Sequence, residues 1–321
     1  MNKHKYKEIA SSEIIRLFSQ PHWLDAVCGE DSWDAVVLEN NGVSVAAMPF
    51  YLEVKYGLRF ISQPLLTQSL GPWLSPYEGK YHKQLSRQKR LINLLIEELP
   101  SFDYFCQNFH YSITNWLPFY WKGFQQVTRY TYVLEDLSDT DFVWSRFREN
   151  IRREIRKASK KLVIRTDLGI EKFLDLNLMT FKRQGIRPPY SRKFVNRLDF
   201  TCKKQGSRKI FFAEDSDGNV HSAIYIVWDK HSAYYLMGGA DPALRSSGAT
   251  SLLMWEAIQH AATVTQKFDF EGSMIESVER FFRAFGARQV PYFQISKMSK
   301  RAKFLMSGRN FVKSSLELAR W

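Results

Sequence analysis

Cysteine is scarce in this chain of 321 residues, which has only Cys28, Cys106 and Cys202. An odd number of widely spaced cysteines argues against a disulfide framework and fits a reducing compartment. The seven histidines show no metal-ligand spacing, and no CxxC pair is present. A zinc site or a catalytic Cys–His pair is therefore not expected.

Long apolar runs are also absent. No stretch approaches the ~18 apolar residues that a membrane-spanning helix needs. The start of the chain is basic but has no apolar core of a signal peptide. Short-period repeats and low-complexity segments are missing too. We therefore expect a globular cytoplasmic protein; the alternative is a peripheral protein at the inner face of the membrane.

Positive charge and aromatic residues are abundant. The net charge is +13, and aromatic residues make up 15% of the chain. A chain of this charge attracts polyanions such as nucleic acid, anionic membrane or phosphate-rich small molecules. The aromatic content suits large buried cores or a cleft with aromatic walls.

The length predicts two domains. In the first, two strands flank Asn41-Gly42, a strong hairpin signal. A helix is expected over 83–98, with strands at 102–109 and 126–136. The polar segment 138–141 can cap a following helix, so we place the boundary there, with domains at 1–137 and 138–321.

The second region begins with an apolar stripe at helical spacing, which predicts one helix from Phe142 onward. The stripe consists of Phe147, Ile151, Ile155, Ala158 and Leu162. Further elements are expected as helices at 171–183 and 192–204, strands at 208–215, 220–229 and 232–240, a helix at 247–263, a strand at 267–272, a helix at 278–286 and a strand at 289–297.

The turn before the 247–263 helix has the composition of an anion site. A helix N-terminus leaves N–H groups unpaired and carries partial positive charge, and glycine lets backbone approach a ligand. The segment supplies Met237, Gly238, Gly239, Arg245, Ser246, Ser247, Gly248, Ala249 and Thr250. We expect it to hold a phosphate or pyrophosphate; the alternative is an ordinary helix cap and turn.

The pattern Arg245-x-x-Gly248-Ala249-Thr250 resembles the acyl-CoA pyrophosphate loop of the GNAT N-acyltransferase superfamily. The segments LLMWEAIQHA, FDFEGS and FFRAFGARQVPYFQISK resemble its FemAB-like, or BioF2-like (Acetyltransf_6-type), branch, as does the basic helix NIRREIRKASK. The resemblance implies an α/β (α+β) fold of tandem GNAT-like domains, each a mixed, mostly antiparallel sheet flanked by helices. It also implies an acyltransferase with acyl-CoA as donor and no metal.

The same resemblance directs attention to the chemistry of the site. In the GNAT pattern an amine attacks a thioester, backbone N–H groups near Met237 and Gly238 stabilise the oxyanion, and a base removes a proton. Strand alternation puts Asp269 and Glu271 on one face, and both are candidate bases. Tyr292 is a candidate acid for the leaving thiolate; the alternative is a core tyrosine.

Candidate acceptor contacts lie in two further segments. Arg187 and Tyr190 occupy the loop that covers the acceptor in GNAT proteins, and Arg187 could select an acidic acceptor. FemAB-like proteins commonly show Phe-Lys-x-x-Phe-Gly, where this chain has Phe282 at the Lys position. Arg283 is a candidate for the missing charge.

Three functions remain open at this stage. The leading prediction is acyl transfer from acyl-CoA to a small-molecule amine. The second is a FemAB-like aminoacyl-tRNA-dependent transfer to a cell-wall precursor or envelope metabolite, favoured by the basic helix 146–161 and the basic tail 297–321. The third is a non-catalytic module that binds an anionic polymer; specific DNA recognition is not expected, because no reading motif is present.

Overall fold

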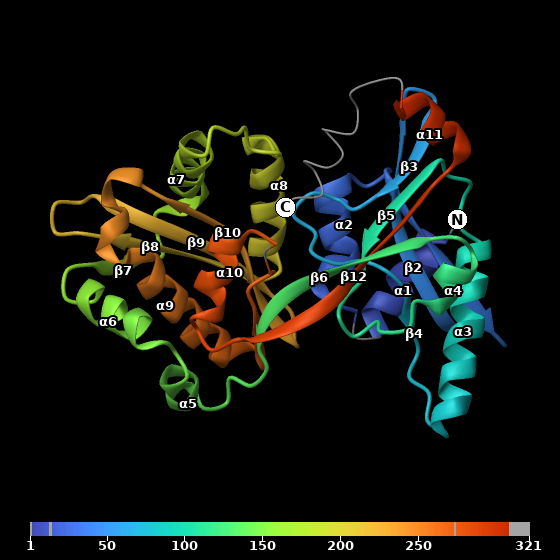
Figure 1. Ribbon diagram of the computed structural model, residues 1–321, viewed down its shortest axis with the longest axis horizontal. Coiled ribbons are helices and arrows are strands. Elements are labelled where there is room, and N and C mark those ends of the chain that lie inside the picture. Colours follow the sequence, from blue (N-terminus) through green and yellow to red (C-terminus); the bar gives the residue numbers. More distant parts are fainter. Residues whose placement is uncertain (1, 13–14, 273, 308–321) are drawn as a thin grey trace. The chain divides into compact units, whose positions relative to one another are not determined.

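The computed structural model describes residues 2–12, 15–272 and 274–307, which form two compact units (Figure 1). The first unit comprises the residues up to Arg129 and the described residues from Pro291 onward. The second comprises Tyr130–Val290. Two strands, β6 (Gln125–Leu134) and β12 (Arg288–Met298), pass along the chain from one unit into the other.

The first unit contains a mixed sheet in the order β1-β2-β3-β5-β12, with β4 paired to β2. Among its described strands, β3 and β5 pair in parallel, and β1–β2, β2–β3, β2–β4 and β5–β12 pair antiparallel. Its other elements are α1 (Lys3–Ser12), a 3-10 turn (Leu17–Ser19), α2 (Pro21–Cys28), β1 (Trp33–Asn40), β2 (Val43–Lys55), β3 (Leu58–Ser62), β4 (Trp73–Leu74), α3 (Tyr81–Glu97), β5 (Tyr104–Asn108), α4 (Leu117–Trp121) and α11 (Lys300–Ser307).

Helices cover both faces of the first unit's sheet. On one face α3 and α4 bury Leu91, Leu95 and Phe119 against Met48 and Phe105. On the other face α1 and α2 pack on β1 and β2. Consecutive residues are therefore buried in β1 and β2, at 35–37 and 46–50, because successive side chains point to opposite faces and both faces are covered.

The second unit also contains a mixed, mostly antiparallel sheet, in the order β6-β11-β10-β9-β8-β7. Among its described strands, β10 and β11 pair in parallel and the other neighbours pair antiparallel. Its elements are α5 (Thr140–Ser145), α6 (Glu149–Ala158), β7 (Val163–Arg165), α7 (Gly169–Arg183), α8 (Arg192–Lys204), β8 (Arg208–Glu214), β9 (Val220–Trp228), β10 (Ser232–Ala240), a 3-10 turn (Pro242–Ser247), α9 (Ala249–Val264), β11 (Lys267–Asp269) and α10 (Glu276–Arg283).

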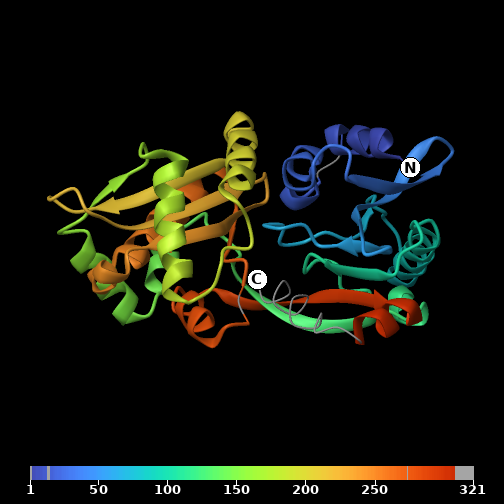
Figure 2. The same cartoon turned by 90° about the horizontal axis from the view of Figure 1, so that it is seen from above.

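The central strand of this unit, β9, is buried along almost its whole length. Its Ile224 and Ile226 join the core formed with α6 and α9. Tyr225 points the other way and meets Phe173 of α7, with ring centroids 5.7 Å apart. Helices α7 and α9 therefore lie on opposite faces of the sheet, as Figure 2 shows. A strand with both faces covered loses the polar alternation of a surface strand.

The predicted fold class is confirmed, since the described chain forms mixed, mostly antiparallel sheets flanked by helices. The hairpin at Asn41-Gly42 is present, and both residues adopt left-handed backbone angles, with φ of 50° and 76°. The three meandering strands and the helix after them are also present. Helices α1, α2 and α11 and the short strand β7 were not predicted.

The single helix predicted from Phe142 is wrong, because the structure breaks it into α5 and α6. Arg148 between them is extended, with φ −58° and ψ 143°, and its N–H donates to the carbonyl of Ala284 at 2.9 Å. The stripe of Phe147, Ile151, Ile155, Ala158 and Leu162 is nevertheless buried throughout. The pattern thus marked the buried face, while a contact with a distant segment ended the helix.

The predicted boundary between residues 137 and 138 remains a prediction. The compact units divide the chain after Arg129 and again after Val290. The predicted second domain, 138–321, includes the described residues 291–307, whereas the structure groups these residues with the first unit. The reason is strand pairing: Gln294 to Met298 of β12 pair antiparallel with Asn108 to Tyr104 of β5.

Candidate functional site

Strand β10 leaves its neighbour β11 partway along its length. The two strands pair in parallel only from Ser232 to Tyr234, and β11 ends at Asp269, the partner of Tyr234. On its other side β10 stays paired with β9 as far as Ala240. The edge of β10 beyond Tyr234 is therefore not paired to β11.

A β-bulge lies in β10 where this open edge begins. Tyr235 and Met237 pair with Ile226 and Tyr225, which are consecutive residues of β9. Leu236 is thus an extra residue on β10. A bulge disrupts the ladder locally and redirects backbone groups, and bulges are over-represented beside active sites.

Side chains of α7 bind the backbone of β10 beyond the bulge. The Asn177 amide donates to the Gly238 carbonyl at 2.8 Å, and the Ala240 N–H donates to the Thr180 hydroxyl at 3.1 Å. The N–H and C=O of one strand residue point to the same side of the strand. The Gly238 N–H therefore faces the same edge as its carbonyl, which is the edge open toward β11.

Gly239 lets α7 approach the strand closely. A Cβ at this position would lie 2.4 Å from the backbone nitrogen of Asn177 and 2.5 Å from the carbonyl carbon of Leu176. Since the obstacle is helix backbone, it cannot move aside as a flexible side chain would. Glycine at 239 is thus required by packing.

We expect Gly239→Ala to lower the free energy of unfolding by ~3 kcal/mol, because α7 must move away from β10. Chemical denaturation measures the change. Gly218→Ala is the control: Gly218 is also a glycine in the second unit, but its added Cβ would contact nothing and would cost only left-handed strain. A Gly239→Ala protein no less stable than the Gly218→Ala protein would contradict this packing.

Two acids end the neighbouring strand. Asp269 is 2% exposed, and its Oδ1 accepts hydrogen bonds from the Thr131 hydroxyl and, at 2.8 Å, from the Glu271 N–H. Because β11 ends at Asp269, the expected strand alternation does not extend to Glu271. Glu271 instead adopts a left-handed conformation with φ 59°. Such a conformation costs a non-glycine residue ~1–2 kcal/mol and is enriched at functional sites.

The surroundings disfavour the charged form of both acids. Burial raises the pKa of the Asp269 carboxyl to about 6, although the Thr131 and Glu271 hydrogen bonds oppose the rise. Burial, and then the charge of Asp269, raise the pKa of the Glu271 carboxyl well above its usual range. Carboxyls with raised pKa values at the end of a strand are suited to proton transfer near neutral pH.

The turn before α9 forms the N-terminus of that helix. Gly248 is the N-cap, with a left-handed φ of 77°, and α9 starts at Ala249. Arg245 and Ser246 are exposed, whereas Ser247 Oγ accepts the Ala249 N–H at 3.3 Å. The predicted residues 245–250 therefore span the end of the 3-10 turn, the N-cap Gly248 and the first residues of α9.

Two neighbouring elements hold this turn. Thr250 Oγ1 lies 3.0 Å from Ser222 Oγ of β9, which in turn donates to the Gly239 carbonyl at 3.1 Å. Helix α6 packs directly against the turn, since a Cβ on Gly248 would lie 3.1 Å from the Glu154 carbonyl. The turn is thereby connected both to the strand with the bulge and to the basic helix.

The loop 184–191 reaches the same region through one residue. The Tyr190 hydroxyl donates to Asn177 Oδ1 at 3.1 Å, and burial raises the pKa of Tyr190 to about 12. Tyr190 and Gly238 thus bind the same amide. Arg187, in the same loop, is exposed.

Tyr292 and Arg283 are the two other candidates. Tyr292 is 9% exposed and belongs to β12 within the first unit, whereas the acids belong to the second. Arg283 is half exposed at the end of α10 and binds Glu279 at 2.8 Å. Phe282, at the position of the family's lysine, is buried in the core of the second unit.

Sequence reasoning missed Asn177, Thr180, Thr131 and Tyr235. A Cβ on Gly238 would lie 2.0 Å from the Tyr235 hydroxyl, so this phenol covers the glycine. Asn177 is 4% exposed within the apolar run Leu-Asn-Leu-Met of α7. The sequence could have indicated this residue, because a polar side chain within an apolar helical segment is a buried amide that needs a specific partner.

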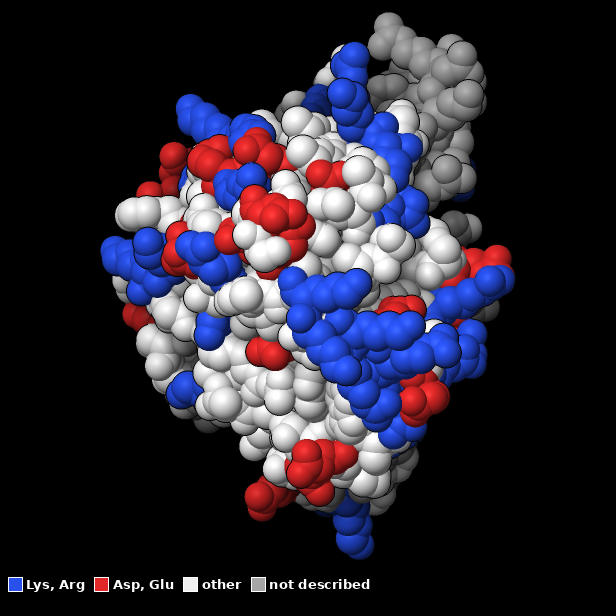
Figure 3. Space-filling view, turned by 90° about the vertical axis from the view of Figure 1, so that its left-hand side faces the viewer, with Lys and Arg blue, Asp and Glu red and all other residues white. Residues whose placement is uncertain are grey.

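The basic surface of this unit follows α6 and its flanks. Figure 3 shows Lys and Arg side chains gathered on this side of the molecule. The exposed ones from this segment are Arg146, Arg148, Arg153, Arg156, Lys157, Lys160 and Lys161. Of the two acids, Glu149 pairs with Arg152 and Arg156, and Glu154 accepts the Ser251 hydroxyl at 2.8 Å. Of the expected basic tail, residues 308–321 lie outside the described residues.

Neither a metal cluster nor a spanning helix is found in the described ranges. Within residues 2–12, 15–272 and 274–307, no group of His, Cys, Asp and Glu side chains could hold a metal ion. Over the same residues, none of the helices has the length and apolar character to span a bilayer. The three cysteines are free thiols.

Residues 145–283 match the family Acetyltransf_6, an acetyltransferase (GNAT) domain. No curated protein matches the sequence. The crystal structure of FemX shares 11% identity and a TM-score of 0.64, covering 91% of this chain and 96% of FemX. A conserved protein of unknown function from Bacteroides thetaiotaomicron shares 11% identity and a TM-score of 0.55, covering 93% of this chain and 97% of that one.

A third solved structure, that of L-PGS from Bacillus licheniformis, shares 11% identity and a TM-score of 0.50, covering 93% of this chain and 92% of that one. At these identities the likeness shows the fold alone. The matched family is the one that the motifs around Gly248 and Glu271 resemble. The chain is therefore a transferase that carries a GNAT acetyltransferase domain at residues 145–283, within a chain fold similar to that of FemX.

Proposed function

We propose that the second unit transfers an acyl group from acyl-CoA to an amine, by direct attack where β10 and β11 separate. This proposal rests on two groups that follow the point where the strands separate. The last paired residues there are Tyr234 of β10 and Asp269 of β11. The Gly238 N–H lies on one strand, and the Glu271 carboxyl follows the other. Acyl transfer needs such a donor for the oxyanion and such a base for the amine proton.

The proposed step balances with these groups alone. The amine nitrogen attacks the thioester carbonyl carbon, and the oxyanion accepts the Gly238 N–H. The nitrogen loses a proton to the Glu271 carboxylate. The C–N bond is retained while the C–S bond breaks, and the CoA thiolate leaves and takes up the proton that Glu271 accepted from the amine. Asp269 and Thr131 act as positioning residues, because they fix the backbone of Glu271.

In the same proposal, the turn 245–250 holds the phosphates of the donor. The Ala249 N–H is bound by Ser247 Oγ, so the N–H groups that follow it in the first turn of α9 would face the anion, and the helix dipole favours its charge. Arg245 is exposed beside this turn and adds a positive charge. Charge-assisted hydrogen bonds of this kind are the stronger ones.

We expect Arg245→Glu to weaken acetyl-CoA binding by about tenfold or more, because one charge-assisted contact becomes a repulsion. Calorimetric titration of the full-length protein with acetyl-CoA and longer acyl-CoAs measures the change. Lys172→Glu, an exposed charge reversal on α7, is the matched control and should bind as the natural protein does. Absence of saturable binding of any acyl-CoA by the natural protein would overturn the proposed donor.

A second donor is favoured by one observation. The exposed basic face of α6 lies on the helix that packs against Gly248. A charged tRNA carries both an activated aminoacyl ester and a phosphate backbone that such a face attracts. The acceptor would then be the amine of a cell-wall precursor or envelope metabolite, and Arg187 would favour an acidic one.

Salt dependence separates the two donors. Affinity for a tRNA should fall steeply as salt rises, whereas that for one acyl-CoA should fall much less. The non-catalytic alternative, a module for an anionic polymer, predicts salt-dependent binding of any polyanion and no transfer. The cytoplasmic location expected from the dispersed cysteines stays a prediction.

A further inference from the structure

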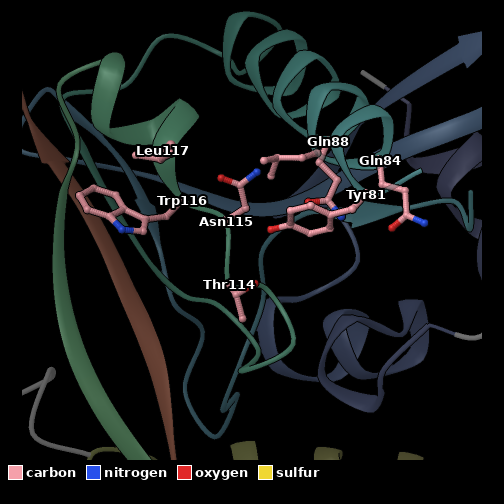
Figure 4. Close-up of a pocket in the computed structure, with 8 residues that line it drawn as sticks. Tyr81, Gln84, Gln88, Thr114, Asn115, Trp116 and Leu117 are labelled. Carbon is pink, nitrogen blue, oxygen red and sulfur yellow. The ribbon is translucent and has the colours of Figure 1, made fainter. Parts of the chain in front are cut away.

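Figure 4 shows a cavity of about 400 Å³ on the first unit, between α3 and the segment before α4. Tyr81, one of the residues that line it, is 77% exposed, and the Asn115 amide nitrogen is enclosed by protein. Neither group can therefore hold a ligand inside this cavity. Tyr235 of the second unit is placed differently, since its hydroxyl lies beside the residue proposed to stabilise the oxyanion.

The Tyr235 hydroxyl lies against Gly238. Tyr235 is the last residue of β10 before the bulge at Leu236. A Cβ on Gly238 would lie 2.0 Å from the hydroxyl oxygen and 3.1 Å from the ring carbon that bears it. The phenol is thus directed along the strand and over Gly238, whose N–H faces the edge open toward β11. An oxygen atom at that edge can meet both the N–H and the hydroxyl.

The core of the second unit holds the ring of Tyr235. The ring packs against the buried cluster to which α6, α9 and α10 contribute. Its centroid lies 5.9 Å from that of Phe282, with an angle of 79° between the ring planes. A hydroxyl on a ring held in this way needs little reorganisation when charge develops beside it.

The hydroxyl of Tyr235 is available to a ligand. Within residues 2–12, 15–272 and 274–307, its side chain makes no hydrogen bond. The hydroxyl is not enclosed either, because Tyr235 is only half-buried and its oxygen is not among the fully buried, unpartnered atoms of these residues. A tyrosine hydroxyl inside a protein normally has a partner, as that of Tyr225 has in Asp199.

The phenol also keeps its proton near neutral pH. Burial, and then the neighbouring Tyr190, raise the pKa of Tyr235 above its ordinary value of 10. The pKa of a thiol is about 8.5, so transfer of the phenol proton to a departing thiolate would be unfavourable. A neutral phenol instead suits hydrogen-bond donation without proton transfer, which is what an oxyanion requires.

We propose that the Tyr235 hydroxyl is the second donor to the oxyanion, beside the Gly238 N–H. This role rests on the acyl transfer proposed above. The O–H bond of Tyr235 stays intact, and the amine proton still passes to Glu271. Two donors aimed at the oxygen stabilise the charge that develops in the transition state more than they stabilise the neutral carbonyl. A thioester and the aminoacyl ester of a tRNA form the same oxyanion, so the role is independent of the donor substrate.

Steady-state kinetics of Tyr235→Phe test this role, with acetyl-CoA and a small amine that the natural protein acetylates. We expect kcat to fall by about 10²-fold, the usual loss for one oxyanion donor, and KM for acetyl-CoA to change by less than about twofold. The factor should be constant from about pH 6 to pH 9, because the phenol does not titrate there. The urea midpoint should not move, since phenylalanine keeps the ring packing.

Tyr225→Phe is the matched control, because Tyr225 is another buried tyrosine of the second unit. It loses the hydrogen bond to Asp199, so it should unfold at lower urea but keep the natural kcat. A Tyr235→Phe rate within about threefold of the natural rate would overturn the second donor and leave acyl transfer standing. A loss that varies with pH would also overturn it, since the phenol would then transfer its proton. Absence of transfer by the natural protein, from acetyl-CoA and from aminoacyl-tRNA alike, would overturn the proposed function and the second donor together.

Discussion

Replacing Glu271 by glutamine is expected to lower kcat for acyl transfer by about 10²–10⁴-fold, the usual contribution of a general base. Glutamine keeps the shape of the side chain but cannot accept the amine proton. Burial and the nearby Asp269 raise the pKa of Glu271, so the carboxyl is protonated up to a higher pH than an ordinary glutamate. A base works only when deprotonated, and activity should therefore rise with pH through that pKa.

The measurement is the pH profile of kcat for the natural protein, for Glu271→Gln and for a second variant, Glu256→Gln. Glu256→Gln is the matched control, because Glu256 also lies in the second unit and burial also raises its pKa. It should retain full activity. A Glu271→Gln enzyme within about fivefold of the natural rate would remove Glu271 from the proposed role.

Asp269→Asn is expected to stabilise the protein at neutral pH while disturbing its activity. The asparagine oxygen can still accept from the Thr131 hydroxyl and the Glu271 N–H, and the substitution removes a buried charge. The pKa of Asp269 is about 6 in the folded protein against 3.8 as its ordinary value. At ~1.36 kcal/mol for each pKa unit, the charged form costs the fold about 3 kcal/mol.

The sign of the pH dependence follows from the raised pKa. The contribution of Asp269 to stability is fully present below about pH 4 and is lost as pH rises through about 6. Asp269→Asn should therefore match the natural protein at pH 4 and exceed it at pH 7.5, as measured by urea denaturation. The activity profile should also shift to lower pH, since the charge that raises the pKa of Glu271 is gone. Equal stability at both pH values would contradict this account.

Features of the fold that depend on neighbouring residues could be predicted from short sequence patterns. Asn41-Gly42 specifies a tight left-handed turn through its own backbone preferences, so the hairpin could be predicted. The turn at Gly248 could be located in the same way. The stripe from Phe147 to Leu162 predicted burial correctly but not a continuous helix, because the break at Arg148 depends on Ala284.

Features that depend on distant partners could not be predicted. In the pairing of β12 with β5, Met298 lies opposite Tyr104, and no short sequence pattern predicts this pairing. The hydrogen bond of Asn177 to Gly238 joins residues 61 positions apart. Strand alternation put Asp269 and Glu271 together on one face; the strand in fact ends between them, and a hydrogen bond joins them.

The central claim is transfer of an acyl group to an amine by the second unit. Mass spectrometry of a mixture of small amines incubated with the full-length protein and acetyl-CoA tests it most directly. The account predicts that at least one amine gains an acetyl group with stoichiometric release of free CoA thiol, and that Glu271→Gln lowers the rate of both by about 10²-fold or more. Release of thiol with no acylated amine, or acylation that Glu271→Gln leaves intact, would contradict it.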